Sequence, residues 1–293
     1  FAVHELREET RKTNLMGKKR VPLPHVFNSN RSPVIRLSET VSIGGGTPII
    51  IAGPCTLESQ EHAITLGLQV KSAGAHIFRG SIRKPRTNPH SFQGWPPDHV
   101  VWHSRAKAVH GLLTETEVLD VRDVEITAEH VDLLRVGARN MQNFVLLDEV
   151  GQSHRPVILK RNPSATISEW LSAAEYLLQH ASCPGVILCE RGIRTFETTT
   201  RYTLDLNTVA WIKKETSLPV IVDPSHASGR RDLVLPLARA AIALGADGLM
   251  IEVHEHPELA LCDGSQHILP CELEELGLWV QEIGSLETGA VFV

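Results

Sequence analysis

The stretch Ile49-Ile50-Ile51-Ala52 is a short run of apolar, mostly β-branched residues, and Gly53-Pro54-Cys55 follows it directly. A run of this kind, bounded by Gly and Pro, predicts a buried strand. Seven similar runs follow, each separated from the next by a longer stretch. They are Ala75-His76-Ile77-Phe78, Leu112-Leu113-Thr114-Glu115, Val131-Asp132-Leu133-Leu134, Pro156-Val157-Ile158-Leu159, Gly185-Val186-Ile187-Leu188, Leu218-Pro219-Val220-Ile221-Val222 and Gly248-Leu249-Met250-Ile251.

Stretches with helical periodicity lie between many of these runs, and a last helix is predicted from Glu272 to about Ile283. The intervening helical stretches are residues 58–73, 166–180, 205–216 and 231–244. Eight strand-then-helix units over about 245 residues match the size of a (β/α)8 TIM barrel, an α/β fold. An open doubly wound sheet is the alternative, but it normally has fewer strands and a glycine-rich dinucleotide motif that this sequence lacks.

Residues 1–47 differ in character from the catalytic barrel that we predict for residues 48–285, and residues 286–293 are predicted to form a tail. A charged helical segment is predicted at residues 5–13. Val34-Ile35-Arg36-Leu37 and Thr40-Val41-Ser42-Ile43 then predict a β-hairpin. Because this hairpin comes just before the first barrel strand, we expect its apolar side chains to cover the bottom of the barrel.

The chain has 29 basic and 34 acidic residues, a formal net charge of −5 and 42% hydrophobic residues. This balance favours a folded domain and argues against nucleic acid or an anionic membrane as the main partner. No apolar run approaches the ~18 residues of a membrane span. The five cysteines include no CxxC pair, so they indicate neither a disulfide framework nor structural zinc and fit a reducing cytoplasm. The start at Phe1 suggests trimming, and no export signal follows it.

Charged or metal-binding side chains follow every predicted strand, at the end where TIM barrels carry their chemistry. Six of these residues are Arg or Lys, and at one end of the barrel their positive charges would repel each other. A substrate with phosphate and carboxylate groups would compensate these charges. The alternative is that each cation is solvated or paired with a nearby carboxylate. The strand-end residues are Cys55, Arg79, Glu117, Arg139, Lys160, Arg191, His226 and Glu252, with Lys84 and Arg86 in the loop after Arg79.

Four of the predicted site residues could share a divalent ion. Cys55, His226 and Glu252 follow the first, seventh and eighth strands, which are neighbours in a closed barrel, and Asp263 comes in the next loop. Sulfur, nitrogen and oxygen ligands favour manganese, iron, cobalt or zinc over magnesium or calcium. From spacing alone, Cys55 could equally be an inert buried thiol.

Several longer motifs occur in a fixed order. They are Ala52-Gly53-Pro54-Cys55, Phe78-Arg79-Gly80, Lys84-Pro85-Arg86-Thr87, Ser91-Phe92-Gln93-Gly94, Gly137-Ala138-Arg139-Asn140-Met141-Gln142-Asn143, Cys189-Glu190-Arg191-Gly192, Asp223-Pro224-Ser225-His226-Ala227 and Ile251-Glu252-Val253-His254. Together they closely resemble the 3-deoxy-D-arabino-heptulosonate 7-phosphate (DAHP) synthases, type I, in the branch that also resembles the 3-deoxy-octulosonate 8-phosphate (KDO8P) synthases. The resemblance covers about residues 33–283.

The resemblance implies a TIM barrel that condenses phosphoenolpyruvate with erythrose 4-phosphate in the first step of the shikimate pathway, with a divalent metal. The implied metal ligands are Cys55, His226, Glu252 and Asp263. The implied phosphoenolpyruvate ligands are Arg79, Lys84, Arg139, Lys160, Arg191 and the backbone of Ala138. The implied aldose phosphate ligands are Arg86 and Thr87 in the Lys84-Pro85-Arg86-Thr87 loop, with Asp263 beside them. The implied catalytic residues are Lys84 as a proton carrier, Glu117 near the site of water attack, and His226.

The loop at residues 84–87 favours erythrose 4-phosphate, since KDO8P synthases usually have Lys-Ala-Asn-Arg-Ser there. Arabinose 5-phosphate and a tetrose phosphate of specialised metabolism stay open as acceptors, because Trp95-Pro96-Pro97 and Trp102 are unusual for the family. A Schiff-base aldolase using Lys160 and a non-catalytic barrel are the rival functions. The resemblance implies a homo-oligomer, commonly a tetramer. The 47-residue leader is short for a regulatory domain, so we expect weak or no feedback inhibition by aromatic amino acids.

Overall fold

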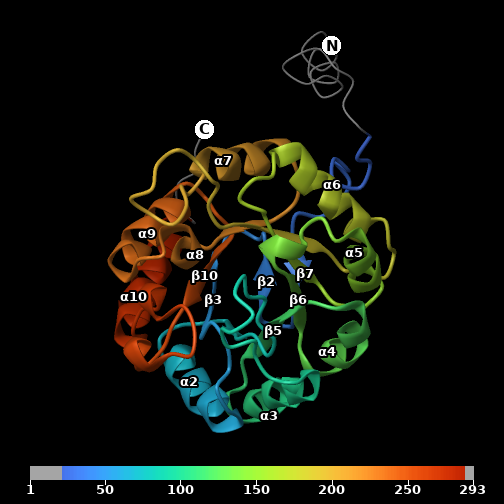
Figure 1. Ribbon diagram of the computed structural model, residues 1–293. Helices are drawn as coiled ribbons and strands as arrows, with labels where there is room; N and C mark the ends of the chain where they lie inside the picture. Colours follow the sequence, from blue (N-terminus) through green and yellow to red (C-terminus); the bar gives the residue numbers. More distant parts are fainter. Residues whose placement is uncertain (1–21, 288–293) are drawn as a thin grey trace.

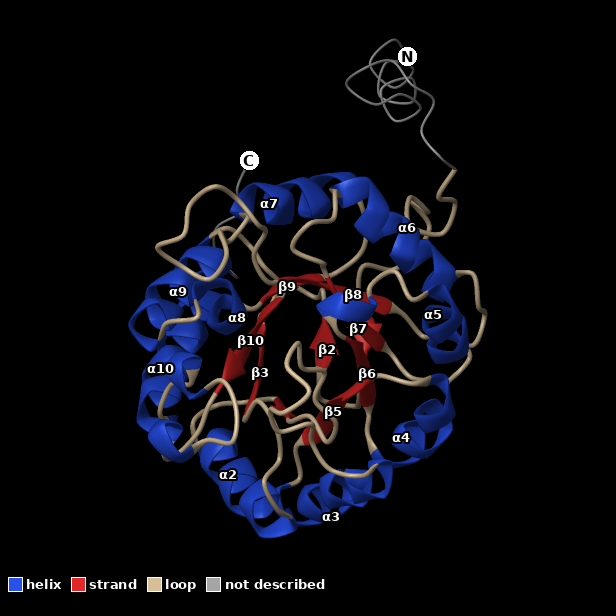
Figure 2. Cartoon of the chain, viewed as in Figure 1, coloured by secondary structure: helices blue, strands red, loops and turns tan. Residues whose placement is uncertain are grey.

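The computed structural model describes residues 22–287, which fold around a closed barrel of eight parallel strands. The strand order around the barrel is β10-β3-β4-β5-β6-β7-β8-β9, so strands that are consecutive in the chain lie side by side. Figure 2 shows the strands inside a ring of helices. The predicted (β/α)8 fold and all eight strands are confirmed. The barrel strands are β3 (Ile49–Gly53), β4 (Ile77–Arg79), β5 (Leu113–Val118), β6 (Leu133–Val136), β7 (Val157–Lys160), β8 (Val186–Glu190), β9 (Val220–Val222) and β10 (Gly248–Glu252).

Burial on both faces explains why the strands are nearly continuous apolar runs. Every residue of β3 is buried. Ile50 and Ala52 pack outward with the helices, whereas Ile49 and Ile51 belong to the apolar cluster inside the barrel. Both strand faces therefore contribute to hydrophobic stabilisation.

The helices predicted at residues 58–73, 166–180 and 205–216 are present, and capping side chains help to start them. Ser59 accepts a hydrogen bond from the backbone N–H of His62, and Thr166 with Glu169 forms a capping box. The stretch predicted at 231–244 begins instead as a 3-10 turn, Arg231–Leu233, and the last helix continues to Glu287. The α-helices are α2 (Gln60–Ser72), α3 (Val101–His110), α4 (Val124–His130), α5 (Phe144–Gly151), α6 (Ile167–Leu178), α7 (Leu206–Glu215), α8 (Pro224–Ser228), α9 (Val234–Ala243) and α10 (Pro270–Glu287).

None of the helices within residues 22–287 combines the length and apolar character needed to cross a membrane. The helix predicted at residues 5–13 lies outside the described residues.

A two-stranded antiparallel sheet precedes the barrel, formed by β1 (Ile35–Arg36) and β2 (Ser42–Ile43). Its Ile35 and Ile43 are buried and join the apolar cluster inside the barrel. Ile35 also packs against Gly185, where an added Cβ would lie 2.6 Å from the Ile35 Cδ1 atom. Gly185 directly precedes β8, so the hairpin lies at the amino ends of the strands, and β2 is visible through the barrel in Figure 1.

Replacing Ile43 by alanine is expected to lower the free energy of unfolding by about 2–4 kcal/mol, because it leaves a cavity where the side chain is fully buried. Urea denaturation measures this change. The matched control is Val34→Ala in the same hairpin, whose side chain is 40% exposed and should cost less than about 1 kcal/mol. Equal costs at the two positions would contradict a hairpin anchored in the barrel.

Candidate active site

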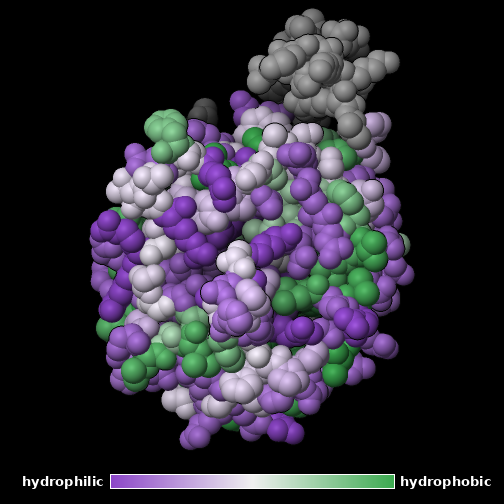
Figure 3. All heavy atoms as spheres, in the orientation of Figure 1, coloured by the Kyte–Doolittle hydropathy of each residue, from purple (hydrophilic) through white to green (hydrophobic). Residues whose placement is uncertain are grey.

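A cavity of about 400 Å³ opens at the carboxyl ends of the strands, and its lining is dominated by cations. Figure 3 shows this face, where hydrophilic residues surround a hollow near the centre. Among the described residues that line it, Asp263 alone is a carboxylate. The cavity therefore suits an anionic ligand. The lining residues are Lys84, Pro85, Arg86, Thr87, Ala138, Arg139, Asn162, Pro163, Ser164, Arg191, Arg194, Arg201, Tyr202, His226 and Asp263.

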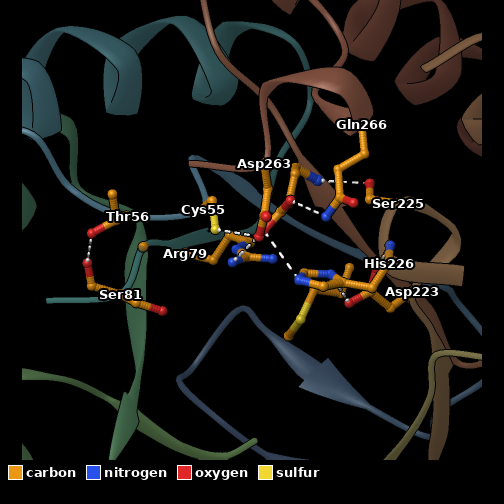
Figure 4. Close-up of polar contacts among 12 residues, drawn as sticks. Cys55, Thr56, Arg79, Ser81, Asp223, Ser225, His226, Asp263 and Gln266 are labelled. Atoms are coloured by element: carbon orange, nitrogen blue, oxygen red, sulfur yellow. Dashed lines mark hydrogen bonds and ion pairs between the residues drawn. The ribbon is translucent and has the colours of Figure 1, made fainter. Parts of the chain in front are cut away.

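The four predicted metal ligands come together at the edge of this cavity. Cys55 follows β3, Glu252 ends β10, His226 lies in α8 and Asp263 lies in the loop after β10. The Cys55 Sγ atom lies 3.1 Å from Asp263 Oδ2, and His226 Nε2 lies 3.4 Å from Glu252 Oε1. One ligand atom each from His226, Glu252 and Asp263 lie within 4.8 Å of one another. In Figure 4 the side chains of Cys55, Asp263 and His226 point toward a common centre.

Neighbouring groups orient these donors. Asp223 Oδ2 lies 2.8 Å from His226 Nδ1, while Gln266 donates a hydrogen bond of 2.6 Å to Glu252 Oε2. Burial lowers the pKa of His226 to about 3, although Asp223 and Glu252 oppose this shift. The ring is thus neutral near pH 7, and an Nδ1 proton held toward Asp223 leaves Nε2 free to bind a metal.

The donor set fits a divalent transition ion. Burial alone would raise the pKa of Glu252, but the positive charges of Arg79 and Lys84 help to hold it well below its usual value, so the carboxylate is ionised. Its Oε1 atom is buried and has no hydrogen-bond partner within the described residues. Sulfur, imidazole nitrogen and carboxylate oxygen are the ligands that borderline first-row metals accept.

Beneath the cavity, charged side chains continue into the barrel as alternating cations and carboxylates. Arg79 is fully buried, with its Nη2 atom 3.1 Å from Glu252 Oε1 and its Nε atom 4.0 Å from Glu115 Oε1. Arg135 lies 3.2 Å from the other oxygen of Glu115 and donates a hydrogen bond to Ser81 Oγ. Burial alone would lower the pKa of Arg79, but the carboxylates of Glu252 and Glu115 raise it above its ordinary value. Arg79 is therefore charged and already paired.

Lys160, at the end of β7, is also a paired cation below the cavity. Its Nζ atom lies 2.5 Å from Asp223 Oδ2, and both side chains are buried. Burial lowers the pKa of Lys160, against the opposing effect of Asp223. The same Asp223 faces His226, so this carboxylate connects the cation to the proposed metal ligands.

Arg191 differs from these residues because its charge has no carboxylate partner. It is 6% exposed and lines the cavity, and no carboxylate within the described residues lies within 4.0 Å of it. Its Nη1 atom is buried without a hydrogen-bond partner in that part of the chain. The exposed Arg139 and Arg194 line the same cavity. A buried guanidinium of this kind is available for an external anion.

The loop at residues 84–87 is held in place by the unusual segment that follows it. The Lys84 N–H donates to the Gln93 carbonyl, and the Trp95 N–H donates to the Ile82 carbonyl. The Trp95 indole N–H also donates to the Leu57 carbonyl at 2.7 Å. These bonds place Lys84 Nζ 3.6 Å from Asp263, beside the proposed metal ligands.

The structure brings most of the predicted site residues to one place. Glu117 is the exception: it lines a separate small cavity and packs against Gly137. Four predicted residues lie directly beneath the cavity lining and are buried: Cys55, Arg79, Lys160 and Glu252. The predicted residues in the lining are Lys84, Pro85, Arg86, Thr87, Ala138, Arg139, Arg191, His226 and Asp263.

Sequence reasoning missed several residues that complete the site. Glu115 and Arg135 could have been noticed as charges inside strands that should be apolar. Asp223 stands in a quoted motif, but its contact with both Lys160 and His226 depends on the fold. Tyr202 had no sequence signal, because it reaches the cavity through a long loop.

Comparison with known proteins identifies the family. Residues 31–288 match the family model described as the DAHP synthetase I family. The chain belongs to this family. It is 47% identical over 228 residues to a phospho-2-dehydro-3-deoxyheptonate aldolase of Thermotoga maritima, covering 78% of this chain and 67% of that protein. A 2-dehydro-3-deoxyphosphooctonate aldolase of Desulfotalea psychrophila is 31% identical over 257 residues, covering 80% of this chain and 90% of that protein.

A solved structure supports the same relationship. The crystal structure of the Thermotoga maritima DAHP synthase aligns with a TM-score of 0.85 and 42% identity, covering 92% of this chain and 79% of that one. The family predicted from the ordered motifs is confirmed, and relatives of the octulosonate type are present as expected for that branch.

Replacing Glu115 by leucine is expected to lower the free energy of unfolding by about 3–5 kcal/mol, because it leaves Arg135 and Arg79 short of a buried counter-charge. The double variant Glu115→Leu/Arg135→Met removes both charges of the closer pair and should recover part of this loss. Denaturant unfolding of the single and double variants measures the difference.

The matched control is Glu275→Leu, which breaks an exposed ion pair with Arg239 and should cost less than about 1 kcal/mol. A double variant less stable than the single variant would show that the buried pair is not the source of the loss.

Proposed function

We propose that the chain condenses phosphoenolpyruvate with D-erythrose 4-phosphate to give DAHP and phosphate, with a divalent metal ion. The observation that carries this proposal is Arg191, a nearly buried cation without a carboxylate partner among the described residues, facing a cavity lined by further arginines. The family and the name of the Thermotoga maritima relative support the same reaction. Phosphoenolpyruvate carries a phosphate and a carboxylate, the two groups that Arg binds through paired hydrogen bonds.

Each substrate would be fixed by its anionic end. Arg191, Arg139 and the backbone of Ala138 would bind phosphoenolpyruvate, while Arg79 and Lys160 would contribute charge from beneath the cavity. Arg86 and Thr87, with Pro85 between Arg86 and Lys84 in the same loop, would bind the phosphate of the aldose. Holding both reactants in this way orients the C3 carbon of phosphoenolpyruvate toward the aldehyde carbon, which is the main requirement for a weak carbon nucleophile.

The metal would be bound by Cys55, His226, Glu252 and Asp263. When bound, such an ion polarises a carbonyl oxygen or lowers the pKa of a water molecule. Asp223 would hold the tautomer of His226, and Gln266 would keep Glu252 oriented. These two residues act through the ligands rather than on the substrate.

Carbon–carbon bond formation leaves positive character at C2 of phosphoenolpyruvate, and water adds there. The resulting hemiketal phosphate loses phosphate by cleavage of its C–O bond. Lys84 is the residue best placed to pass a proton, because its Nζ atom lies at the cavity beside Asp263. Burial alone would lower the pKa of Lys84, but Cys55, Glu252 and other nearby groups raise it above its usual value, so it is protonated near pH 7. Glu117 lines a separate cavity beside Gly137, so its role near the site of water attack rests on the family resemblance alone.

The test of the proposal is an acceptor panel, with phosphate release measured as the initial rate in the presence of phosphoenolpyruvate. Erythrose 4-phosphate should give a kcat/KM at least about tenfold higher than arabinose 5-phosphate or ribose 5-phosphate. A chelator should abolish turnover, and added divalent metal should restore it. A preference for a five-carbon acceptor would replace erythrose 4-phosphate in the proposal. A stable adduct at Lys160 after borohydride treatment with substrate would favour the Schiff-base aldolase instead.

Replacing Cys55 by serine should weaken metal binding at least about tenfold, because a thiolate ligand is lost from the shell. Metal content per chain after dialysis against a graded metal buffer measures this without using activity. The matched control is Cys271→Ser, since Cys271 is an exposed free thiol that belongs to none of the possible metal-binding groups of the described residues. Equal metal retention in the two variants would remove Cys55 from the ligand set.

A further inference from the structure

The buried cations of the described residues divide into two kinds. Five of them lie within 4.0 Å of a carboxylate, and Arg191 alone does not. In place of a carboxylate, Arg191 has an aromatic ring: its Cζ atom lies 4.4 Å from the centre of the Tyr202 ring. The five paired cations are Arg79, Lys84, Arg135, Lys160 and Arg161.

Backbone contacts hold Tyr202 in this position. The Tyr202 N–H donates to the Ala227 carbonyl at 2.8 Å, which ties the tyrosine to the helix that carries His226. Gly192 accommodates the contact, because its φ is +94° and an added Cβ would lie 2.6 Å from the Tyr202 Cβ atom. These contacts fix the backbone of Tyr202 at the place where its ring packs beside Arg191.

Arg194 and Arg201 line the same cavity as Arg191 and Tyr202. The Arg201 Cζ atom lies 5.9 Å from the centre of the Tyr202 ring. The ring of Tyr202 thus lies close to two arginines of the cavity lining, Arg191 and Arg201.

A carboxylate and an aromatic ring differ in what they do to a neighbouring guanidinium. A carboxylate fixes its position but also neutralises it and competes for the N–H groups that a phosphate or carboxylate ligand would use. An aromatic face attracts the cation through the ring quadrupole and leaves the charge and the edge N–H groups available. The environment of Arg191 therefore favours binding of an external anion.

We infer that Tyr202 is a positioning residue, which holds Arg191 ready to bind the anionic end of phosphoenolpyruvate without competing for it. The inference rests on the proposed function for the identity of the anion. Tyr202 thereby joins the candidate site, and an acidic side chain at position 202 would instead pair with Arg191 and compete with the ligand.

The experiment uses three substitutions at one position in the full chain. Tyr202→Phe keeps the ring and loses the hydroxyl, Tyr202→Gln loses the ring, and Tyr202→Glu has nearly the shape of glutamine but adds a negative charge. The control is Tyr176→Phe, which alters an exposed tyrosine stacked on Phe144. Dissociation constants for phosphoenolpyruvate and inorganic phosphate are measured by calorimetric titration, and KM and kcat by initial rates with saturating metal.

Tyr202→Phe should bind phosphoenolpyruvate within about threefold of the unmodified chain, since most of the cation–π attraction remains. Tyr202→Gln should raise the dissociation constant and the KM for phosphoenolpyruvate about tenfold, with little change in kcat or in the KM for the aldose phosphate. Tyr202→Glu should raise them about tenfold further, because its charge pairs with Arg191. Inorganic phosphate should follow the same order, and Tyr176→Phe should change nothing.

Other results overturn the inference in distinct ways. If the unmodified chain binds phosphoenolpyruvate and Tyr202→Gln binds it equally well, Tyr202 has no positioning role and the proposed function stands. If Tyr202→Phe loses as much affinity as Tyr202→Gln, the ring is not what positions Arg191. Equal affinities of the Gln and Glu variants for phosphoenolpyruvate would show that a negative charge at position 202 does not affect Arg191. This comparison stays valid if both variants are less stable than the unmodified chain. Failure of the unmodified chain to bind phosphoenolpyruvate would instead overturn the proposed function.

Discussion

A buried cation inside a protein requires a nearby counter-charge, because removing an ion from water without one costs several kcal/mol. Glu252 supplies this counter-charge to Arg79. It is fully buried at the end of β10, 3.1 Å from Arg79 and 3.4 Å from His226. The same carboxylate offers an oxygen to the proposed metal site. Glu252 therefore connects the charges inside the barrel to the chemistry at its mouth.

This requirement explains the arrangement of charges with depth. Arg79 and Lys160 have carboxylates of their own, so they stabilise the fold and supply positive potential beneath the cavity. Arg191 is placed higher and lacks such a partner within the described residues, so its charge faces the cavity. The neighbouring side chain makes this difference. Glu252 stands beside Arg79, Asp223 stands beside Lys160, and the ring of Tyr202 stands beside Arg191. A buried cation can thus either stabilise the fold through a paired carboxylate or stay available for an external anion.

Strand periodicity and motif order were enough to predict the barrel and the position of most site residues. Runs such as Ile49-Ile50-Ile51-Ala52 are informative because a strand buried on both faces must be apolar throughout. The same rule does not predict the ion pair of Glu115 and Arg135, because the partner of a charge within one strand lies on the next strand and is known only from the structure. Glu115 and Arg135 stand 20 positions apart in the sequence, and the parallel pairing of β5 with β6 brings them together. Tyr202 was hidden for a similar reason, because its contact with Arg191 depends on the path of the intervening loop.

The carboxylate of Asp263 contacts both a proposed metal ligand and the loop at residues 84–87. Its Oδ2 atom lies 3.1 Å from Cys55 Sγ and 3.6 Å from Lys84 Nζ, and its Oδ1 atom lies 3.8 Å from Arg86 Nη1. The residue adopts the left-handed backbone region with φ of 56°, which is uncommon for a residue with a side chain and must be maintained by its surroundings. Under the proposed function, binding of a metal by Asp263 would draw its negative charge away from Lys84 and Arg86. Because those two cations stand at the acceptor loop, their charge would then be more available to the phosphate of the aldose. Under the proposed function, the metal ligands and the loop at residues 84–87 would therefore form one electrostatic unit rather than independent sites.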